Sequence, residues 1–323
     1  MKIKGDLMTF RPDIQVLDAT LRDGGLVNNF RFTDEFVHDL YLANIKAGID
    51  YMEFGYKASK ELFNVDDYGK WKFSDDEDIR AIVGDNNTDL KIAVMADVGR
   101  CDYKNDIRPK NESPVDMIRV ACYIHQIPTA IQMIEDAHKK GYETACNIMA
   151  VSTCSESQIE QALASLCESP VDVIYLVDSY GCFYPLNTRA LTETYLSYAE
   201  KSGKKIGIHA HNNQQLAYAN TMEALTLGAS MADTTMNGMG RGAGNCNTEL
   251  LLSFLRNPKF NIYPVVQFVQ KHMVEMRKNC VWGYDLSYLL TATLNQHPRS
   301  AIEFMGEGRE DYVELYKELL EKM

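Results

Sequence analysis

His209 and His211 are separated by a single residue, and their type and spacing could support metal chemistry. The short segment 204–208 that leads into them favours a β-strand, in which alternate side chains point to the same face. Both imidazoles would then converge on one point at the end of the strand. Two convergent imidazoles can begin a divalent metal site. The alternative is that one histidine is a hydrogen-bonded core residue and the other lies at the surface.

Further polar residues follow other strand-like segments. Arg22 and Asp23 come after the segment 14–18, and the glycine-rich stretch 238–244 runs into Asn245. On its own, such a stretch is typical of a flexible turn. Beside a metal site it indicates a backbone that approaches a ligand closely, because glycine has no side chain to obstruct the contact.

The elements that must position these residues alternate along the chain. Strand-like segments occupy 14–18, 50–56, 90–96, 116–123, 142–150, 171–178, the stretch from 204 into the histidine pair, and 229–235. Helical patterns separate most of them, and 57–74 is predicted to be a long loop. This alternation predicts a parallel β/α architecture. Eight strands over about 250 residues favour a (β/α)8 TIM barrel over a doubly wound sheet.

The strand pattern stops near residue 257. We therefore expect a barrel domain over residues 1–257 and a small α-helical extension over 258–323, with helices at 263–279, 285–294 and 309–322. Such an extension packs either on its own barrel or on a partner subunit. We accordingly expect a homo-oligomer, a dimer formed through these helices.

The composition limits the class of protein. The 323 residues carry a formal net charge of −12, which argues against nucleic acid or an anionic membrane as a partner. No apolar run approaches membrane-spanning length. The eight cysteines are scattered without paired spacing. We therefore expect a protein of the reducing cytoplasm.

Closure of the predicted barrel would bring the chemical residues together. Functional groups of TIM barrels gather at the C-terminal ends of the strands. The seventh and eighth strands become neighbours of the first when the barrel closes. Asp23, the two histidines and Asn245 can therefore meet at one point.

Three motifs, in this order, resemble those of the metal-dependent lyases and synthases built on TIM barrels. The segment 18–24 resembles their D-x-T-L-R-D-G signature, 209–213 their histidine motif, and 238–249 their glycine-rich motif. This superfamily includes 4-hydroxy-2-oxovalerate aldolases, 3-hydroxy-3-methylglutaryl-CoA lyases, and isopropylmalate and homocitrate synthases. The resemblance implies Asp23, His209 and His211 as metal ligands, with Asn245 as a fourth ligand or close neighbour. It also implies that Arg22 stabilises an enolate oxygen.

The implied ligand set suits this chemistry. One carboxylate and two imidazoles leave positions open on a divalent cation, which a 2-oxo acid can fill through its carboxylate and keto oxygens. The cation then acts as a Lewis acid, and Arg22 adds a fixed positive charge. Oxygen and nitrogen ligands favour Mn²⁺ or Mg²⁺, with Zn²⁺ as an alternative. Non-haem iron oxygenases use the same ligand types, but the β/α pattern and the Arg22–Asp23 pair argue against that class.

Within the superfamily, the aldolase branch fits best. Its Asp-Ser-x-Gly and Gly-Tyr motifs are matched by 178–181 and 283–284. The CoA lyases place a catalytic cysteine where this chain has Arg241 or Gly242, and the acyl-CoA synthases show Glu-Gln where it has Gly25-Leu26. We predict an aldolase that cleaves or forms a carbon–carbon bond through a metal-stabilised enolate of a 2-oxo acid, with pyruvate as the expected fragment.

Two other functions remain as alternatives. One is an acyl-CoA-dependent Claisen synthase of the isopropylmalate or homocitrate type, and the other is a metal-binding barrel without full catalytic activity. The expected partner is a small 2-oxo acid, and nothing in the sequence indicates a dehydrogenase partner. The residues predicted to bind the substrate are Arg22, Asp23, Ser179, His209, Glu53 and Arg119.

Glu53 and Arg119 belong to this set because each lies within a predicted strand. If their faces point into the barrel, each is a buried charge that needs a partner. We expect both near Arg22 or near the metal ligands. The alternative is that these faces point outward and the charges are solvated.

One position departs from the aldolases. They have a histidine three residues after the metal-binding aspartate, which acts as the base on the substrate hydroxyl, and here that residue is Leu26. A leucine cannot accept a proton, so either another group does so or the reaction differs. The candidates are His125, just past the fourth strand, and Tyr284, by analogy with the family. The alternative for His125 is a loop histidine that faces the solvent, and the alternative for Tyr284 is an aromatic residue that packs a helix.

Overall fold

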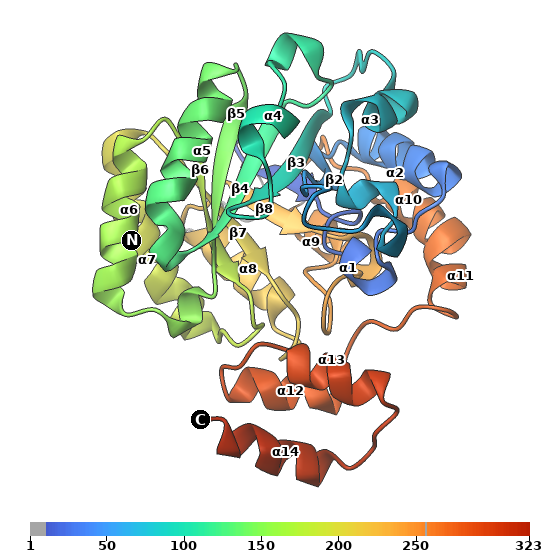
Figure 1. The fold of residues 1–323 in the computed structure, drawn as a ribbon, viewed down its shortest axis with the longest axis vertical. Coiled ribbons are helices and arrows are strands. Elements are labelled where there is room, and N and C mark those ends of the chain that lie inside the picture. The colour runs from blue at the N-terminus through green and yellow to red at the C-terminus, as the bar shows by residue number, and fades with distance from the viewer. Residues whose placement is uncertain (1–10, 256) are drawn as a thin grey trace.

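Eight parallel strands form a barrel (Figure 1). Each strand pairs with its neighbours in sequence, and β8 pairs with β1 to close the barrel. The computed structural model describes residues 11–255 and 257–323. The strands are β1 (Gln15–Asp18), β2 (Tyr51–Tyr56), β3 (Lys91–Asp97), β4 (Met117–Tyr123), β5 (Glu143–Met149), β6 (Val173–Asp178), β7 (Lys205–Ala210) and β8 (Met231–Thr234). The predicted TIM barrel is confirmed, and each strand lies close to its predicted position.

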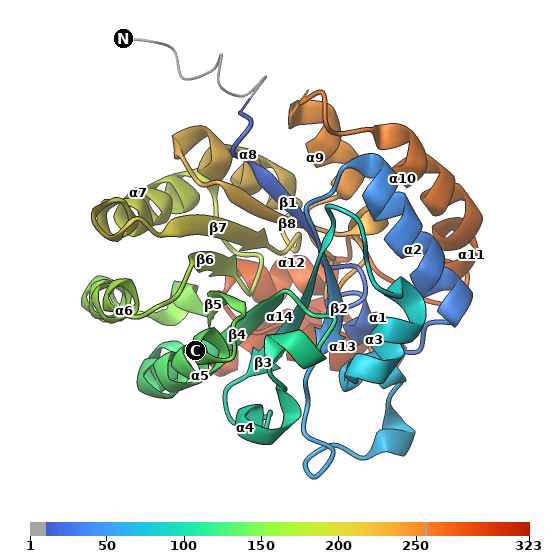
Figure 2. The same ribbon diagram turned by 90° about the horizontal axis from the view of Figure 1, so that it is seen from above.

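A ring of helices surrounds the strands, because parallel neighbours must be joined by crossovers that return along the outside of the sheet (Figure 2). The helices on the barrel are α1 (Gly25–Asn28), α2 (Asp34–Ala47), α3 (Asp76–Val83), α4 (Tyr103–Asp106), α5 (Ile127–Lys139), α6 (Glu156–Glu168), α7 (Pro185–Ser202), α8 (Ala217–Leu227) and α9 (Thr248–Leu255). Among the described residues, no helix combines the length and the apolar character needed to cross a membrane.

Local capping explains where two of these helices begin and end. The hydroxyl of Thr33 accepts the backbone N–H of Phe36 at the start of α2, and Gly48 ends that helix with a φ of 74°, a left-handed conformation that glycine adopts readily. At the start of α6, Ser155 and Gln158 form a reciprocal capping box. These signals made the helix boundaries readable from the sequence.

The inside of the barrel is filled by large side chains. Tyr51, Arg119 and Tyr175 are all fully buried there. The Arg119 guanidinium lies over the Tyr175 ring, with its carbon 4.3 Å from the ring centroid. Gly207 of β7 leaves room for this ring, since a β-carbon at that position would come within 2.5 Å of it. The outward faces of the strands pack instead against the helices in the main apolar core.

The segment 57–74 has little regular structure, as predicted, but it is packed rather than loose. It contains two 3₁₀ turns, Val65–Asp67 and Lys70–Lys72, and Trp71 is fully buried. The ammonium group of Lys72 lies within 5.4 Å of four aromatic ring centroids, those of Phe30, Tyr56, Phe63 and Tyr68. These contacts hold the loop against the end of β2.

The C-terminal tail has two parts. Helix α10 (Ile262–Phe268), a π-helical turn (Val269–Met273) and α11 (Val274–Met276) occupy the place of the single helix predicted at 263–279, and α10 packs on α2. Helices α12 (Leu286–Thr293), α13 (Arg299–Gly306) and α14 (Tyr312–Glu321) lie together below the barrel in Figure 1. Helix α13 was not predicted.

These last three helices cover the end of the barrel at which the strands terminate. Tyr288 and Ala301 form an apolar cluster with Ala243, which belongs to the loop after β8. The Asn295 amide donates to the carbonyl of Ser152, which follows β5. The extension therefore packs on its own barrel. A dimer contact through the same helices stays a prediction.

Charged side chains cross the middle of the barrel. The Arg119 guanidinium donates to Glu53 Oε2 at 2.8 Å and to Asp233 Oδ2 at 2.6 Å. The three side chains are at most 1% exposed. Arg119 thus neutralises carboxylates from two other strands, and the inward orientation expected for Glu53 and Arg119 is confirmed.

We predict that Arg119→Met lowers the free energy of unfolding by about 3–5 kcal/mol, because it leaves the buried Asp233 carboxylate without its guanidinium partner and removes one of the two arginine contacts of Glu53. Lys91→Met is the control. The Lys91 side chain is 49% exposed in its pair with Glu143, so its loss should cost less than about 1 kcal/mol. Urea denaturation of both variants measures the difference. Equal stabilities for the two variants would contradict the role given to Arg119.

Candidate active site

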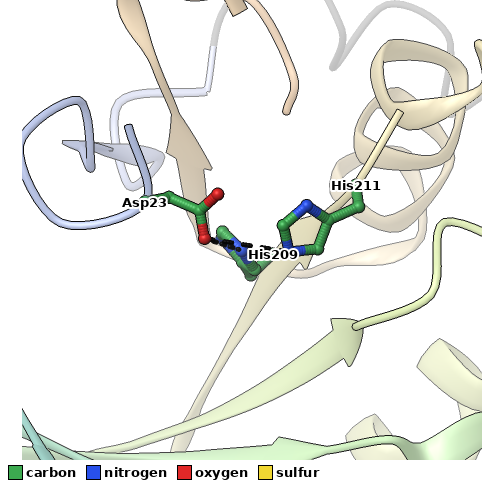
Figure 3. Close-up of side chains that lie close together, drawn as sticks. All are labelled: Asp23, His209 and His211. Carbon is green, nitrogen blue, oxygen red and sulfur yellow. Dashed lines mark ion pairs between the residues drawn. The ribbon is translucent and has the colours of Figure 1, made fainter. Parts of the chain in front are cut away.

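Asp23, His209 and His211 form a cluster at the mouth of the barrel (Figure 3). Asp23 lies in the loop after β1, His209 in β7, and His211 directly after β7. The Asp23 Oδ2 atom is 3.6 Å from His209 Nε2 and 3.7 Å from His211 Nε2. All three side chains are at most 4% exposed. The three predicted ligands therefore present one atom each to a common point.

The turn that presents Asp23 is held by hydrogen bonds from three sides. The Asp18 carboxylate accepts the hydroxyl of Thr20 at 2.5 Å and the amide of Asn44 at 2.9 Å. The Thr20 hydroxyl in turn accepts the backbone N–H of Met236, which follows β8. The first residues of the D-x-T-L-R-D-G motif thus tie the ends of β1 and β8 together and fix the approach of Asp23.

The glycine-rich loop supports the other oxygen of Asp23. The Oδ1 atom of Asp23 accepts hydrogen bonds from the Asn245 side-chain amide at 2.9 Å and from the backbone N–H of Arg241 at 3.0 Å. A β-carbon on Gly240 would come 2.5 Å from this oxygen and 1.9 Å from the Asn245 amide nitrogen. The glycine allows a close backbone approach to the Asp23 carboxylate, and the approach to a ligand expected from the sequence stays a prediction.

Several buried atoms beside Asp23 have no hydrogen-bond partner. Among them are the Asn245 carbonyl oxygen, Oδ1, and His209 Nε2. Unsatisfied buried acceptors are costly unless something binds them. Asp23 Oδ2, His209 Nε2 and His211 Nε2 form an oxygen and nitrogen donor set that suits Mn²⁺, Mg²⁺ or Zn²⁺, with Asn245 held beside it by Asp23. The residues present therefore fit a divalent cation.

Asp233 of β8 orients His209. Its Oδ2 lies 3.0 Å from His209 Nδ1, an arrangement that leaves Nε2 facing Asp23. Burial and Arg22 lower the pKa of His209, but the flanking carboxylates Asp23 and Asp233 outweigh them and raise it. Asp233 was not predicted as a site residue from the sequence. Its position two residues after inward-facing Met231 was the available signal.

Arg22 joins the cluster to the charges inside the barrel. Its Nε donates to Glu53 Oε2 at 2.8 Å, and one terminal nitrogen donates to Asp23 Oδ2 at 2.5 Å. Burial opposes the charge on Asp23, but His211 and Arg22 beside it hold the pKa of Asp23 well below its usual range. The second terminal nitrogen of Arg22 is buried and has no partner. The N–H groups of this nitrogen can therefore donate hydrogen bonds to a ligand.

A cavity of about 450 Å³ opens beside these groups. Arg22, Asp23, Leu26 and Ser179 line it, and the extension contributes His297. The Ser179 hydroxyl accepts the backbone N–H of Ala150 at 2.9 Å. A small carboxylic acid fits this volume, with the three metal-ligand candidates on its wall.

Two of the residues predicted to be catalytic do not reach the cavity. Tyr284 is 60% exposed, and it is not among the described residues that line the cavity. His125 is exposed and stacks on Tyr123 with 5.9 Å between ring centroids. The chain turns into a 3₁₀ helix directly after β4, which carries His125 outward. Neither residue lies beside Arg22.

Arg241 and Asp97 also line the cavity, but neither was predicted to be a site residue. Arg241 of the glycine loop donates to the Ser179 carbonyl at 2.7 Å, and its guanidinium lies 3.2 Å from His211 Nε2 and 2.9 Å from His297 Nε2. Asp97, the last residue of β3, also lines the cavity. The position of Arg241 among glycines could have indicated a functional residue. For Asp97, the only indication in the sequence was its position at the end of a predicted strand.

The family comparison agrees with the motifs. The family model described as HMGL-like matches residues 13–274. A 4-hydroxy-2-oxovalerate aldolase from Pelotomaculum thermopropionicum is 30% identical over 255 residues, which are 78% of this chain and 72% of the relative. An oxaloacetate decarboxylase from Mycobacterium tuberculosis is 29% identical over 245 residues, which are 75% of this chain and 69% of the relative.

A solved structure extends the similarity to nearly the whole chain. The N-terminal domain of a candidate aldolase from Bacteroides vulgatus superimposes with a TM-score of 0.77 at 26% identity. The match covers 90% of this chain and 96% of that one. The resemblance inferred from the three motifs is confirmed, and the chain belongs to the HMGL-like family.

Proposed function

We propose that the protein is a divalent-metal-dependent carbon–carbon lyase that acts on a small 2-oxo acid and releases or adds pyruvate. The observation that carries this proposal is the convergence of Asp23, His209 and His211 beside the buried guanidinium of Arg22. Membership of the HMGL-like family and the similarity to a 4-hydroxy-2-oxovalerate aldolase support it. Mn²⁺ or Mg²⁺ is the proposed cation.

Asp23, His209 and His211 would hold the cation, with Asn245 beside them. When bound, it supplies Lewis-acid stabilisation of negative charge on the 2-oxo acid. Arg22 is the main contribution of the chain itself, because its unpartnered N–H can donate to the oxygen that becomes negative in the enolate. Glu53 holds this guanidinium in place. A donor fixed before the reaction begins stabilises the developing charge without having to reorganise.

Decarboxylation of oxaloacetate is a second candidate, and Leu26 favours it. Aldol cleavage needs a base for the substrate hydroxyl, and Leu26 lines the cavity at the position where aldolases of the family have one. Loss of carbon dioxide from a 2-oxo acid with a carboxylate on the neighbouring carbon needs no such base. The oxaloacetate decarboxylase relative is as similar to this chain as the aldolases are.

An assay for pyruvate release tests the proposal. The protein, loaded with Mn²⁺ or Mg²⁺, is given a series of 4-hydroxy-2-oxo acids and oxaloacetate, and pyruvate is measured with a coupled dehydrogenase. Release that depends on the cation supports the proposal. Release of free thiol from an acyl-CoA in the presence of a 2-oxo acid would instead identify a Claisen synthase. Metal binding without any turnover would identify a non-catalytic barrel.

We predict that Asp23→Asn, His209→Ala and His211→Ala each abolish stoichiometric Mn²⁺ binding while the barrel stays folded. Each change removes one of three converging ligand atoms. Metal content after gel filtration and far-UV circular dichroism measure the two properties. His138→Ala, at an exposed histidine of α5, is the matched control and should bind the cation normally. Full occupancy in the His209 and His211 variants would refute the assigned site.

Arg22→Lys should keep the cation but lower kcat by about 10²–10³-fold, the usual cost of removing one donor to a developing oxyanion. A lysine carries the charge but cannot contact Asp23, Glu53 and a substrate oxygen at once. Steady-state kinetics of pyruvate release, together with metal content, separates the two effects. Near-normal turnover would mean that another group stabilises the enolate.

A further inference from the structure

Asp97 stands out among the acidic groups of the cavity. Asp23 and Asp97 are the two carboxylates among the described residues that line it. Asp23 is committed to the metal-ligand cluster. Asp97 ends β3, which lies one strand beyond β2 and two beyond β1 in the barrel. It therefore faces the same cavity as Arg22 from a different part of the wall.

The Asp97 side chain is only 14% exposed, and its carboxylate has few polar partners. Its Oδ1 is buried and has no hydrogen-bond partner, and its one ion-pair contact is to Arg100 at 3.9 Å. Glu53 and Asp233 also have one buried oxygen without a partner, but the other oxygen of each accepts a direct hydrogen bond from an arginine at 2.8 Å or less. An oxygen without a partner is free to accept a proton.

Other titratable groups of the cavity are less suited to accept a proton. Burial raises the pKa of Tyr56 and of Tyr180, so both phenols keep their protons at neutral pH. Burial, with Arg241 and Arg299 nearby, lowers the pKa of His297 to about 4, and its Nδ1 already accepts the backbone N–H of Arg299 at 3.0 Å. Its Nε2 also lies 2.9 Å from the Arg241 guanidinium.

We propose that Asp97 is the proton-transfer residue of carbon–carbon bond cleavage, replacing the base that Leu26 cannot supply. This inference rests on the function proposed above. The Asp97 carboxylate takes the proton of the 4-hydroxyl group, the oxygen forms a carbonyl, and the bond between carbons 3 and 4 breaks. The electron pair of that bond goes to the enolate of pyruvate. The resulting carboxylic acid then returns the proton to carbon 3, so that Asp97 ends as it began.

The surroundings of Asp97 set the pH at which it can act. Burial raises its pKa above the usual range of aspartate, and Glu53 adds to this, while Arg100, Lys72 and Arg22 oppose it. Tyr56 from β2 also faces it. Since the base must be ionised, the cleavage rate should fall as the pH drops through this raised pKa. The fall should lie above the pH range of an ordinary aspartate.

The first experiment compares two reactions in one variant. Asp97→Asn should lower kcat for cleavage of a 4-hydroxy-2-oxo acid by about 10²–10⁴-fold, the usual worth of general base catalysis. Decarboxylation of oxaloacetate should change less than about 10-fold, because it needs no base on a hydroxyl. Asp102→Asn, on the exposed loop after β3, is the matched control and should alter neither rate. Metal content and thermal unfolding show whether the fold is intact.

The pH profile gives a readout that a purely structural role would not move. The acidic fall of kcat/KM for cleavage should be present in the natural protein and absent in Asp97→Asn. Placing a base at position 26 provides the second readout. In the double variant Asp97→Asn, Leu26→His, the new imidazole should restore cleavage at least about 10-fold over Asp97→Asn, within the range of general base catalysis.

The outcomes separate this inference from the proposed function. If the natural protein releases pyruvate from 4-hydroxy-2-oxo acids and Asp97→Asn does so equally fast, the role of Asp97 is refuted and the lyase proposal stands. If both reactions and metal binding are lost together in Asp97→Asn, its role is structural and the inference is again refuted. If the natural protein cleaves neither substrate class, both the proposed function and the inference fail.

Discussion

A ring of buried charges inside the barrel is the interaction on which the site depends. Each member contacts the next, and the ring runs through Asp23, Arg22, Glu53, Arg119, Asp233 and His209, whose Nε2 faces Asp23 again. Three carboxylates face two guanidinium groups, so the ring carries one excess negative charge, which favours the binding of a cation. Loss of any one member would leave each of its two neighbours buried with one charged contact fewer. Metal affinity and stability of the barrel interior are therefore coupled.

The ring also explains why this chemistry needs a closed barrel. Its members come from the ends or interiors of β1, β2, β4, β7 and β8, so no short segment of the chain could assemble it. Closure of β8 on β1 places the glycine loop beside Asp23, where Arg241 and Asn245 hold the second carboxylate oxygen. The extension completes the enclosure by bringing His297 to the cavity. The depth of burial strengthens every electrostatic contact made there.

Much of this arrangement could be predicted from the sequence because its signals are local. The alternation of eight strand-like segments with helical ones, the caps at Thr33 and Ser155, and three short motifs predicted the barrel and the metal-ligand candidates. Contacts between distant segments were harder to foresee. The role of Asp233 depends on its contacts with Arg119 and His209, which lie on other strands. Helices α9 and α13 were not predicted, because their short patterns carry no strong start signal. Tyr284 lies outside the cavity, because the extension packs with that residue exposed.

Burial alone does not distinguish Asp97 from the other acidic groups of the barrel. Asp18 and Asp178 are buried as well, and burial raises the pKa of each to about 6. Asp178, however, accepts the backbone N–H groups of Cys182 and Phe183, and Asp18 accepts Thr20 and Asn44. Their carboxylates hold turns in place, and protonation would break those hydrogen bonds. Asp97 Oδ1 holds nothing. A buried oxygen without a partner costs about 1–3 kcal/mol of stability. Where such an oxygen lines a ligand cavity, as that of Asp97 does, a function in contact with the ligand accounts for it.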